Sequence, residues 1–268
     1  GMSGTYSAAF FALPAALLYF FGAYRQWQTL NNKKEANKTL VLTLGSIAGI
    51  LHALVLAGSV VLHQGFNFGF FNVGILISLV ISLLVITSSF SKPLENLLIA
   101  VFPMAALILL VDSITPNSDK VSQLTGGLGW HIILSILAYS ILVIAAIQAI
   151  LLYLQNKQLK SHNTSGLVKA LPPLQTMDAL LFEMIWIGMV LLTAAFVIGW
   201  PYIVDIKEQH LLHKTALSIM SWLVYATLLF GRFNFGWRGI TASRWTLVGT
   251  GFLILAYFGS KFVLELVL

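Results

Sequence analysis

The chain has 268 residues, of which 58% are hydrophobic and only 9% are charged, and its formal net charge at pH 7 is +6. Soluble domains carry about 25% charged residues, so this composition excludes an ordinary soluble protein. The sequence contains no cysteine, which excludes disulfides and thiolate metal sites.

Stretches of about 20 apolar residues recur along the whole chain, and each can cross a hydrocarbon core of about 30 Å. The first has no basic segment before it and no small-residue cleavage site after it, so we expect a retained helix. In chain order we predict eight spans, at residues 7–24, 39–62, 69–90, 95–112, 128–154, 179–201, 213–231 and 244–265. The connections are too short for a soluble domain. The sequence therefore predicts an all-α, polytopic transmembrane helical bundle, with residues 1–268 forming a single domain.

Basic residues gather in the loops that this prediction places on one side of the membrane. Eleven lie in loops 25–38, 91–94, 155–178 and 232–244, whereas the opposite loops carry only Lys120, Lys207 and Lys214. The positive-inside rule then predicts that the basic loops are cytoplasmic and that both termini lie outside. We expect the lipid bilayer, and not nucleic acid, to be the partner of these charges.

The predicted topology separates the histidines by depth. His52 lies near the middle of the second span, where an ionisable residue is a candidate functional group. The alternative is a neutral imidazole that is hydrogen-bonded to a Ser, a Thr or a carbonyl of a neighbouring helix. His131 lies about one turn inside the outer rim, and His213 lies at the rim itself. His162 falls in a cytoplasmic loop, where we expect it to be solvated.

The stretch "HLLHKTALSIMSWLVY", residues 210–225, places two histidines three residues apart just before an apolar run. We expect His210 to precede the helix. Neutral imidazole is a good ligand for haem iron, and two such ligands must lie at matching depth on facing helices. His131 and His213 satisfy this condition, whereas His52 is offset from His131 by roughly 9 Å, which helix tilt reduces in part. The alternative role for His213 is packing at the helix start.

Other sequence signals are few. Trp130, next to His131, is a candidate surface for haem, or an aromatic residue of the membrane interface. The sequence has no Gly-rich phosphate loop, no H-E-x-x-H and no serine nucleophile elbow. We therefore predict no catalytic residues and no enzymatic activity.

The loop "FNFGWRGITASRW", residues 233–245, places Trp237 and Arg238 between two glycines. One interpretation is a tight turn, in which the glycines supply unusual backbone angles and Trp237 lies at the membrane interface. The other is a docking surface for a second membrane protein, because an aromatic residue and an arginine in a short turn make good interface anchors.

Four segments of the chain resemble, in order and spacing, the CcsA/HemX-like integral membrane proteins of cytochrome c assembly, and within them the YpjD branch. These are "GWHIILSILAYSILVIAAIQAILLYLQ", "LPPLQTMDALLFEMIWIGMVLLT", "HKTALSIMSWLVYATLLFGRFNFGWRG" and "LAYFGSKFVLELVL". The resemblance extends over nearly the whole chain. It implies a multi-pass protein of the bacterial cytoplasmic (inner) membrane, with periplasmic termini, that binds or handles haem b near the periplasmic face.

The chain departs from the cytochrome c synthetases of this family, in which a Trp-rich external motif ending in W-D-P-K-E presents haem. Lys214 falls at the Lys of that motif, but Leu212 and His213 fall at its Asp and Pro. Phe230 stands at the position of a synthetase histidine, whereas His131 matches a haem ligand. The resemblance thus implies haem binding without complete synthetase activity. The alternative is a haem-free scaffold or accessory subunit that binds another inner-membrane protein.

Overall fold

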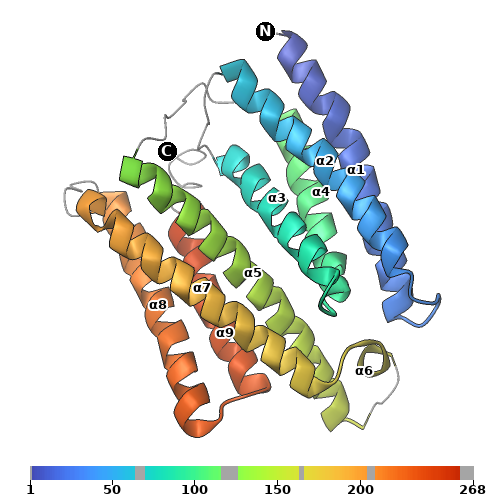
Figure 1. Cartoon of the computed structure of the whole chain (residues 1–268), viewed down its shortest axis with the longest axis vertical. Helices are drawn as coiled ribbons and strands as arrows, with labels where there is room; N and C mark the ends of the chain where they lie inside the picture. The colour runs from blue at the N-terminus through green and yellow to red at the C-terminus, as the bar shows by residue number, and fades with distance from the viewer. Residues whose placement is uncertain (1, 64–69, 116–125, 163–165, 204–208, 260–268) are drawn as a thin grey trace. The chain divides into compact units, whose positions relative to one another are not determined.

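The computed structural model describes residues 2–63, 70–115, 126–162, 166–203 and 209–259, and within these ranges the chain forms helices and no strand (Figure 1). The elements are α1 (Met2–Leu30), α2 (Lys38–His63), α3 (Phe70–Ser89), the 3-10 turn η1 (Glu95–Leu97), α4 (Leu98–Ile114), α5 (Gly126–Lys160), α6 (Leu167–Ala170), α7 (Leu174–Ile203), α8 (Gln209–Phe235), α9 (Ile240–Ile254) and the π-helical turn η2 (Leu255–Gly259). The all-α prediction is therefore confirmed.

Six of the described helical segments are long and apolar enough to cross a membrane. They are Lys38–Val60, Asn72–Ser89, Glu95–Ile114, Gly126–Lys160, Leu174–Tyr202 and Leu212–Phe235. The helices α1 and α9 occupy the positions of the remaining two predicted spans. The protein is thus a polytopic helical membrane protein, as predicted.

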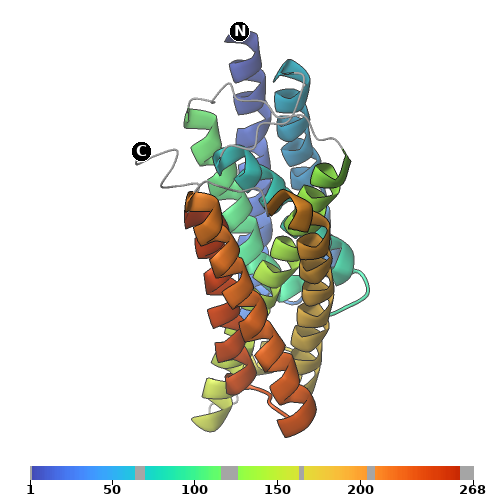
Figure 2. The ribbon, with the colours of Figure 1, turned by 90° about the vertical axis from the view of Figure 1, so that its left-hand side faces the viewer.

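The long helices fall into two compact units, one made of α1 to α4 and the other of α5 and α7 to α9, and the boundary between the units passes through the short helix α6. In the first unit, α1 and α3 each pack against both α2 and α4, so that the four helices close a ring. In the second unit, α5 packs closely against α7 and α9, while α8 packs against α9 and more lightly against α7. Within each unit the long helices run side by side (Figure 2).

Small residues let the helices of the first unit approach one another. Phe102 of α4 is fully buried, and its ring lies against Gly22 of α1 and Gly45 of α2. A Cβ atom added at Gly22 would lie 2.9 Å from Cε2 of Phe102, and one at Gly45 would lie 3.1 Å from Cε1. Close packing at small residues is a main source of helix association in membranes.

Buried polar contacts hold the helices of the second unit. The Ser221 hydroxyl of α8 donates to the Gly249 carbonyl of α9 at 2.7 Å. Tyr225 of α8 is hydrogen-bonded to Thr250 of α9, and the Thr250 hydroxyl in turn donates to the Leu142 carbonyl of α5 at 3.2 Å. These contacts join three helices in a setting where a polar group has no water to bind, and each is expected to contribute about 0.6 kcal/mol.

Candidate functional site

His52 is fully buried in the first unit, and both of its ring nitrogens are hydrogen-bonded. Nε2 lies 3.0 Å from the carbonyl oxygen of Ile75 on α3, and Nδ1 lies 2.8 Å from the hydroxyl of Tyr19 on α1. A carbonyl oxygen accepts only, so Nε2 carries the proton and donates it to Ile75. Nδ1 then accepts from the Tyr19 hydroxyl.

This arrangement is the alternative that the sequence left open for His52, a neutral imidazole bonded to neighbouring helices. The Ser78 hydroxyl of α3 lies 3.4 Å from Nε2 and also donates to the Ile75 carbonyl at 3.0 Å. Because both ring nitrogens are used, neither presents a free lone pair to iron. His52 therefore joins α1, α2 and α3, and this geometry does not favour it as a metal ligand.

His131 is placed differently, in the second turn of α5 within the second unit. Its Nδ1 lies 2.7 Å from the carbonyl oxygen of Ala195 on α7, so Nδ1 carries the proton and donates it. The side chain is half-buried, and within the described part of the chain Nε2 has no hydrogen-bond partner. A neutral imidazole in this tautomer presents the Nε2 lone pair, the state in which histidine binds metals.

A glycine of α7 makes the contact between His131 and α7 possible. A Cβ atom added at Gly199 would lie 2.6 Å from Cε1 of the His131 ring. Gly199 is one helical turn after Ala195, so both residues lie on the α7 face that meets α5. The α5 and α7 helices form the most extensive helix–helix interface in the described residues. The hydrogen bond to Ala195 thus holds the His131 ring, which occupies the space that the missing side chain of Gly199 leaves.

Two other candidate haem-binding residues lie in the second unit, and both have exposed side chains. His213 is exposed in the second turn of α8, and Trp130 is 63% exposed on α5. The prediction that His210 precedes the helix is wrong, because α8 begins at Gln209 and includes it. Its side chain lies outside the described residues. No group of three His, Cys, Asp or Glu side chains forms a metal site in the described residues, whereas haem iron needs only one or two protein ligands.

Trp237 and Arg238, the predicted docking residues, have different environments. Trp237 is half-buried, packs against Gly231 and stacks on Trp245 with ring centroids 5.3 Å apart. Its carbonyl oxygen accepts a hydrogen bond from Nη1 of Arg232 at 3.0 Å. Arg238 is exposed. These contacts favour the tight-turn interpretation for Trp237, whereas Arg238 is the more accessible of the two residues.

An ion pair that the sequence did not predict holds the end of this loop. Nη1 of Arg232 lies 2.7 Å from Oδ2 of Asp178 on α7, and the backbone N–H of Gly239 donates to Oδ1 of Asp178 at 3.1 Å. The Arg232 guanidinium also lies 4.1 Å from the centre of the Phe182 ring. Asp178 thus connects α7, α8 and the start of α9. The signal for this ion pair in the sequence was Asp178, a single carboxylate at the basic end of the predicted span 179–201.

The family of this protein can be assigned from its sequence relatives. A model of the cytochrome c assembly proteins matches residues 40–268, which is most of the chain. The chain belongs to the cytochrome c assembly protein family. The predicted resemblance is thus confirmed.

Two bacterial proteins are similar to the chain over nearly their whole length, and a third is similar over about half of its length. The chain is 32% identical over 262 residues to the inner membrane protein YpjD of Escherichia coli strain K12, covering 96% of this chain and 98% of that protein. It is 24% identical over 262 residues to protein HemX of Brevibacillus brevis, covering 95% and 94%. An uncharacterized 28.8 kDa protein of Azospirillum brasilense is 32% identical over 141 residues, 52% of each chain. No solved structure matches the chain significantly.

Proposed function

We propose that this protein is an inner-membrane, non-catalytic member of the cytochrome c assembly family that binds haem b beside His131, near the periplasmic face. The single observation that carries the proposal is the geometry of His131. Its Nδ1–H is held by the Ala195 carbonyl at 2.7 Å, which leaves Nε2 as the coordinating atom. A metal-binding histidine usually donates its other ring N–H to a carbonyl or a carboxylate, because this hydrogen bond fixes the ring orientation and raises the basicity of the coordinating nitrogen.

The second unit contains side chains with the chemistry that haem requires. Haem needs a neutral imidazole for its iron, apolar surface for the macrocycle and polar groups for its propionates. Trp130 supplies exposed aromatic surface next to His131 on α5. His213 is the second candidate ligand, and the ammonium of Lys214 beside it lies 4.4 Å from the centre of the Tyr257 ring within the same unit. When bound, haem supplies iron for ligation, and the chain supplies its orientation and surroundings.

Absorption spectroscopy tests the proposal directly. We expect the purified protein, or protein incubated with hemin, to show a Soret band that sharpens when dithionite is added. His131→Ala should abolish or strongly weaken this band. His162→Asn is the matched control, because His162 is exposed at positive φ, where asparagine is tolerated. Its spectrum should equal that of the wild type.

A colourless protein that also fails to bind hemin would favour the alternative, a haem-free scaffold that binds another membrane protein. The surface of α8 supports that candidate with its aromatic residues. Phe230 is 61% exposed, Phe233 is 87% exposed and Phe235 is 69% exposed, and they precede the exposed Arg238 in the sequence by three to eight residues. Cross-linking in native membranes, compared between the wild type and Arg238→Ala, would identify a partner that docks there.

The proposed orientation rests on the eleven basic residues that the predicted topology places on one side. A C-terminal fusion to alkaline phosphatase should be active, and the same fusion to green fluorescent protein should be dark. The opposite pattern would place His131 near the cytoplasmic face and would contradict the periplasmic part of the proposal. It would not affect the assignment of His131 as a ligand, which the absorption spectra test.

A further inference from the structure

A groove of about 340 Å³ lies along α2 in the first unit and begins at the first residue of that helix. Its polar end is formed by the side chains of Lys38 and Thr39. Farther along α2 it is lined by Leu42, Ile47 and Ile50, and by Thr43 and Ser46, whose hydroxyls donate to carbonyls of the same helix. Phe90, which directly precedes segment 91–95, also lines it. Ile50 is 62% exposed and Phe90 is 69% exposed, so the groove opens outward. It thus has one polar end and one apolar end.

The groove is aligned with the membrane. The membrane-spanning part of α2 extends from Lys38 to Val60, so the polar end of the groove lies where the span begins. Lys38 and Ile50 are twelve residues apart, a distance of about 18 Å along a helix. One leaflet of the hydrocarbon core measures about 15 Å, half of the full thickness of about 30 Å. The groove is therefore about as long as the depth of one leaflet, which is the depth that one acyl chain occupies.

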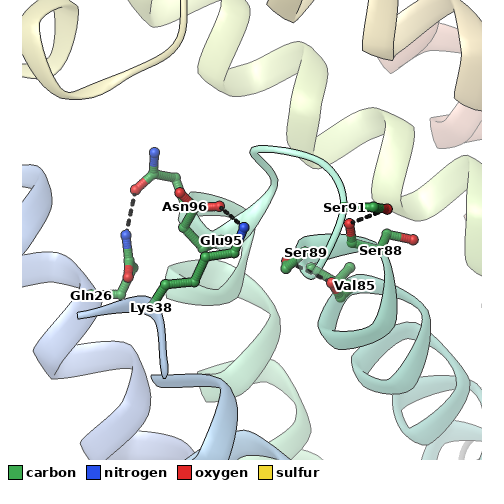
Figure 3. A network of polar contacts seen from close by, with 8 residues as sticks. All are labelled: Gln26, Lys38, Val85, Ser88, Ser89, Ser91, Glu95 and Asn96. Carbon is green, nitrogen blue, oxygen red and sulfur yellow. Dashed lines mark hydrogen bonds and ion pairs between the residues drawn. The ribbon is translucent and has the colours of Figure 1, made fainter. Parts of the chain in front are cut away.

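The polar end of the groove lies in a basic region of the first unit. Segments 25–38 and 91–95 contain five basic side chains and two acidic ones. Two contacts bring these segments together: the Gln26 amide donates to Oδ1 of Asn96 at 2.8 Å, and Lys38 pairs with Glu95 (Figure 3). The excess of positive charge at this end favours an anionic group over a zwitterionic one.

The donors at this end are only partly used by the protein. Nζ of Lys38 lies 3.8 Å from Oε2 of Glu95, which is beyond hydrogen-bond distance, and the Lys38 side chain is 38% exposed against 25% for Glu95. The Thr39 hydroxyl makes no hydrogen bond within the described residues, whereas the Thr43 hydroxyl donates to the Thr39 carbonyl at 2.7 Å. Lys38 and Thr39 are also the first residues of α2, where the helix dipole adds positive potential.

We propose that this groove is a binding site for one phospholipid with an anionic headgroup. The phosphate is bound by the Lys38 ammonium and the Thr39 hydroxyl. One acyl chain lies along α2 against Leu42, Ile47 and Ile50, and Phe90 borders the groove beside segment 91–95. The site lies within the first unit and is independent of haem binding, so its test does not depend on the proposed function.

Native mass spectrometry of the full chain in detergent tests the site. The protein is titrated with dioleoylphosphatidylglycerol or with dioleoylphosphatidylcholine, and the dissociation constant of the first bound lipid is measured. We expect phosphatidylglycerol to bind more tightly. Lys38→Gln should weaken it about fivefold, the factor that corresponds to about 1 kcal/mol for one basic residue near an anionic lipid. Lys157→Gln is the matched control, because Lys157 is exposed at the end of α5 and outside the groove.

Two further variants separate the acyl chain from the charge and from folding. Ile47→Trp fills the groove and should weaken both lipids. Ile187→Trp is its control, because Ile187 is 46% exposed on α7 against 45% for Ile47 on α2. The double variant Lys38→Gln with Glu95→Gln removes the ammonium without leaving the carboxylate unpaired. It should fold as the wild type does and should also lose the preference for phosphatidylglycerol.

Three outcomes would overturn the proposal. The first is equal affinity of the wild type for the two lipids. The second is unchanged phosphatidylglycerol binding in the double variant and in Ile47→Trp. The third is displacement of phosphatidylglycerol by inorganic phosphate at the concentration at which the lipid itself binds, because the acyl chain would then contribute nothing. We expect phosphatidylglycerol binding to weaken only in Lys38→Gln, in the double variant and in Ile47→Trp. The controls Lys157→Gln and Ile187→Trp should bind the lipid as the wild type does.

Discussion

The two helical units of this protein each contain a histidine bonded across helices, but they use its ring differently. In the first unit, both nitrogens of His52 are bonded to other helices, and the side chain is 0% exposed. In the second unit, only Nδ1 of His131 is bonded, and the ring is half-buried. The difference shows that depth alone does not decide function. The number of ring nitrogens that the fold leaves free separates a structural imidazole from a candidate ligand.

The basic ends of the two units differ in a similar way. In the second unit, Arg232 and Asp178 are 2.7 Å apart, and the same arginine also holds the Trp237 carbonyl. In the first unit, Lys38 and Glu95 are 3.8 Å apart and share no hydrogen bond. The tight contact fixes a turn, whereas the loose one leaves an ammonium that an external anion can bind.

Gly199→Ala should have the largest effect on the second unit. The new Cβ atom would lie 2.6 Å from Cε1 of His131, so the ring must leave its position and lose the bond to Ala195. We expect the Soret band to be lost as fully as in His131→Ala. Gly251→Ala is the control, because a Cβ atom there meets nothing within 4 Å. An intact Soret band in Gly199→Ala would show that the hydrogen bond does not position the ligand.

His52→Leu should destabilise the first unit and leave the haem spectrum unchanged. The Tyr19 hydroxyl would lose its His52 acceptor in the core of the unit, at a cost of about 1–3 kcal/mol. The Ile75 carbonyl keeps its hydrogen bond from the Ser78 hydroxyl, so the loss of the His52 bond there adds little to the cost. Thermal unfolding in detergent measures the loss.

The double variant of His52→Leu with Tyr19→Phe sharpens this test. It removes both polar partners, so its cost should be clearly smaller than the sum of the two single costs. Strict additivity, or loss of the Soret band in His52→Leu, would contradict the purely structural role of His52.

Trp237→Ala should destabilise the second unit by about 2 kcal/mol, below the cost of about 3–5 kcal/mol typical of a fully buried tryptophan. The reason is loss of the packing on Gly231 and of the stacking on Trp245. Thermal unfolding in detergent again provides the measurement. If the variant is as stable as the wild type, the packing role is contradicted and the predicted docking role of Trp237 is favoured.

Arg238→Ala should have the smallest effect, a change within about 0.5 kcal/mol in stability, because the side chain is exposed and no contact fixes it in the described residues. If the docking interpretation is correct, this variant should still lose a cross-linked partner in native membranes. Equal destabilisation by Arg238→Ala and Trp237→Ala would make the whole loop structural.

The amino-acid sequence determined the class of fold and the family of this protein. Long apolar stretches, few charges and short connections leave a helical membrane bundle as the only stable arrangement, because every backbone polar group must be satisfied within the bilayer. The sequence also indicated His52, His131 and His213 as the candidate histidines, and it predicted unusual backbone angles at Gly236 and Gly239, which adopt positive φ angles. Composition and hydrophobic patterning suffice for the class of fold because they depend on local physics, whereas the family follows from the resemblance of four segments to known sequences.

Only the tertiary structure decided how those residues are used. The roles of His52 and His131 depend on Tyr19 and Ile75 in one case and on Ala195 and Gly199 in the other. These partners lie between 23 and 64 positions away where they are bonded, and a backbone carbonyl or a missing Cβ atom has no signature in a sequence. A hydrogen bond between helices depends on their rotation and axial register. Packing of small against large side chains sets both, and no single span specifies them.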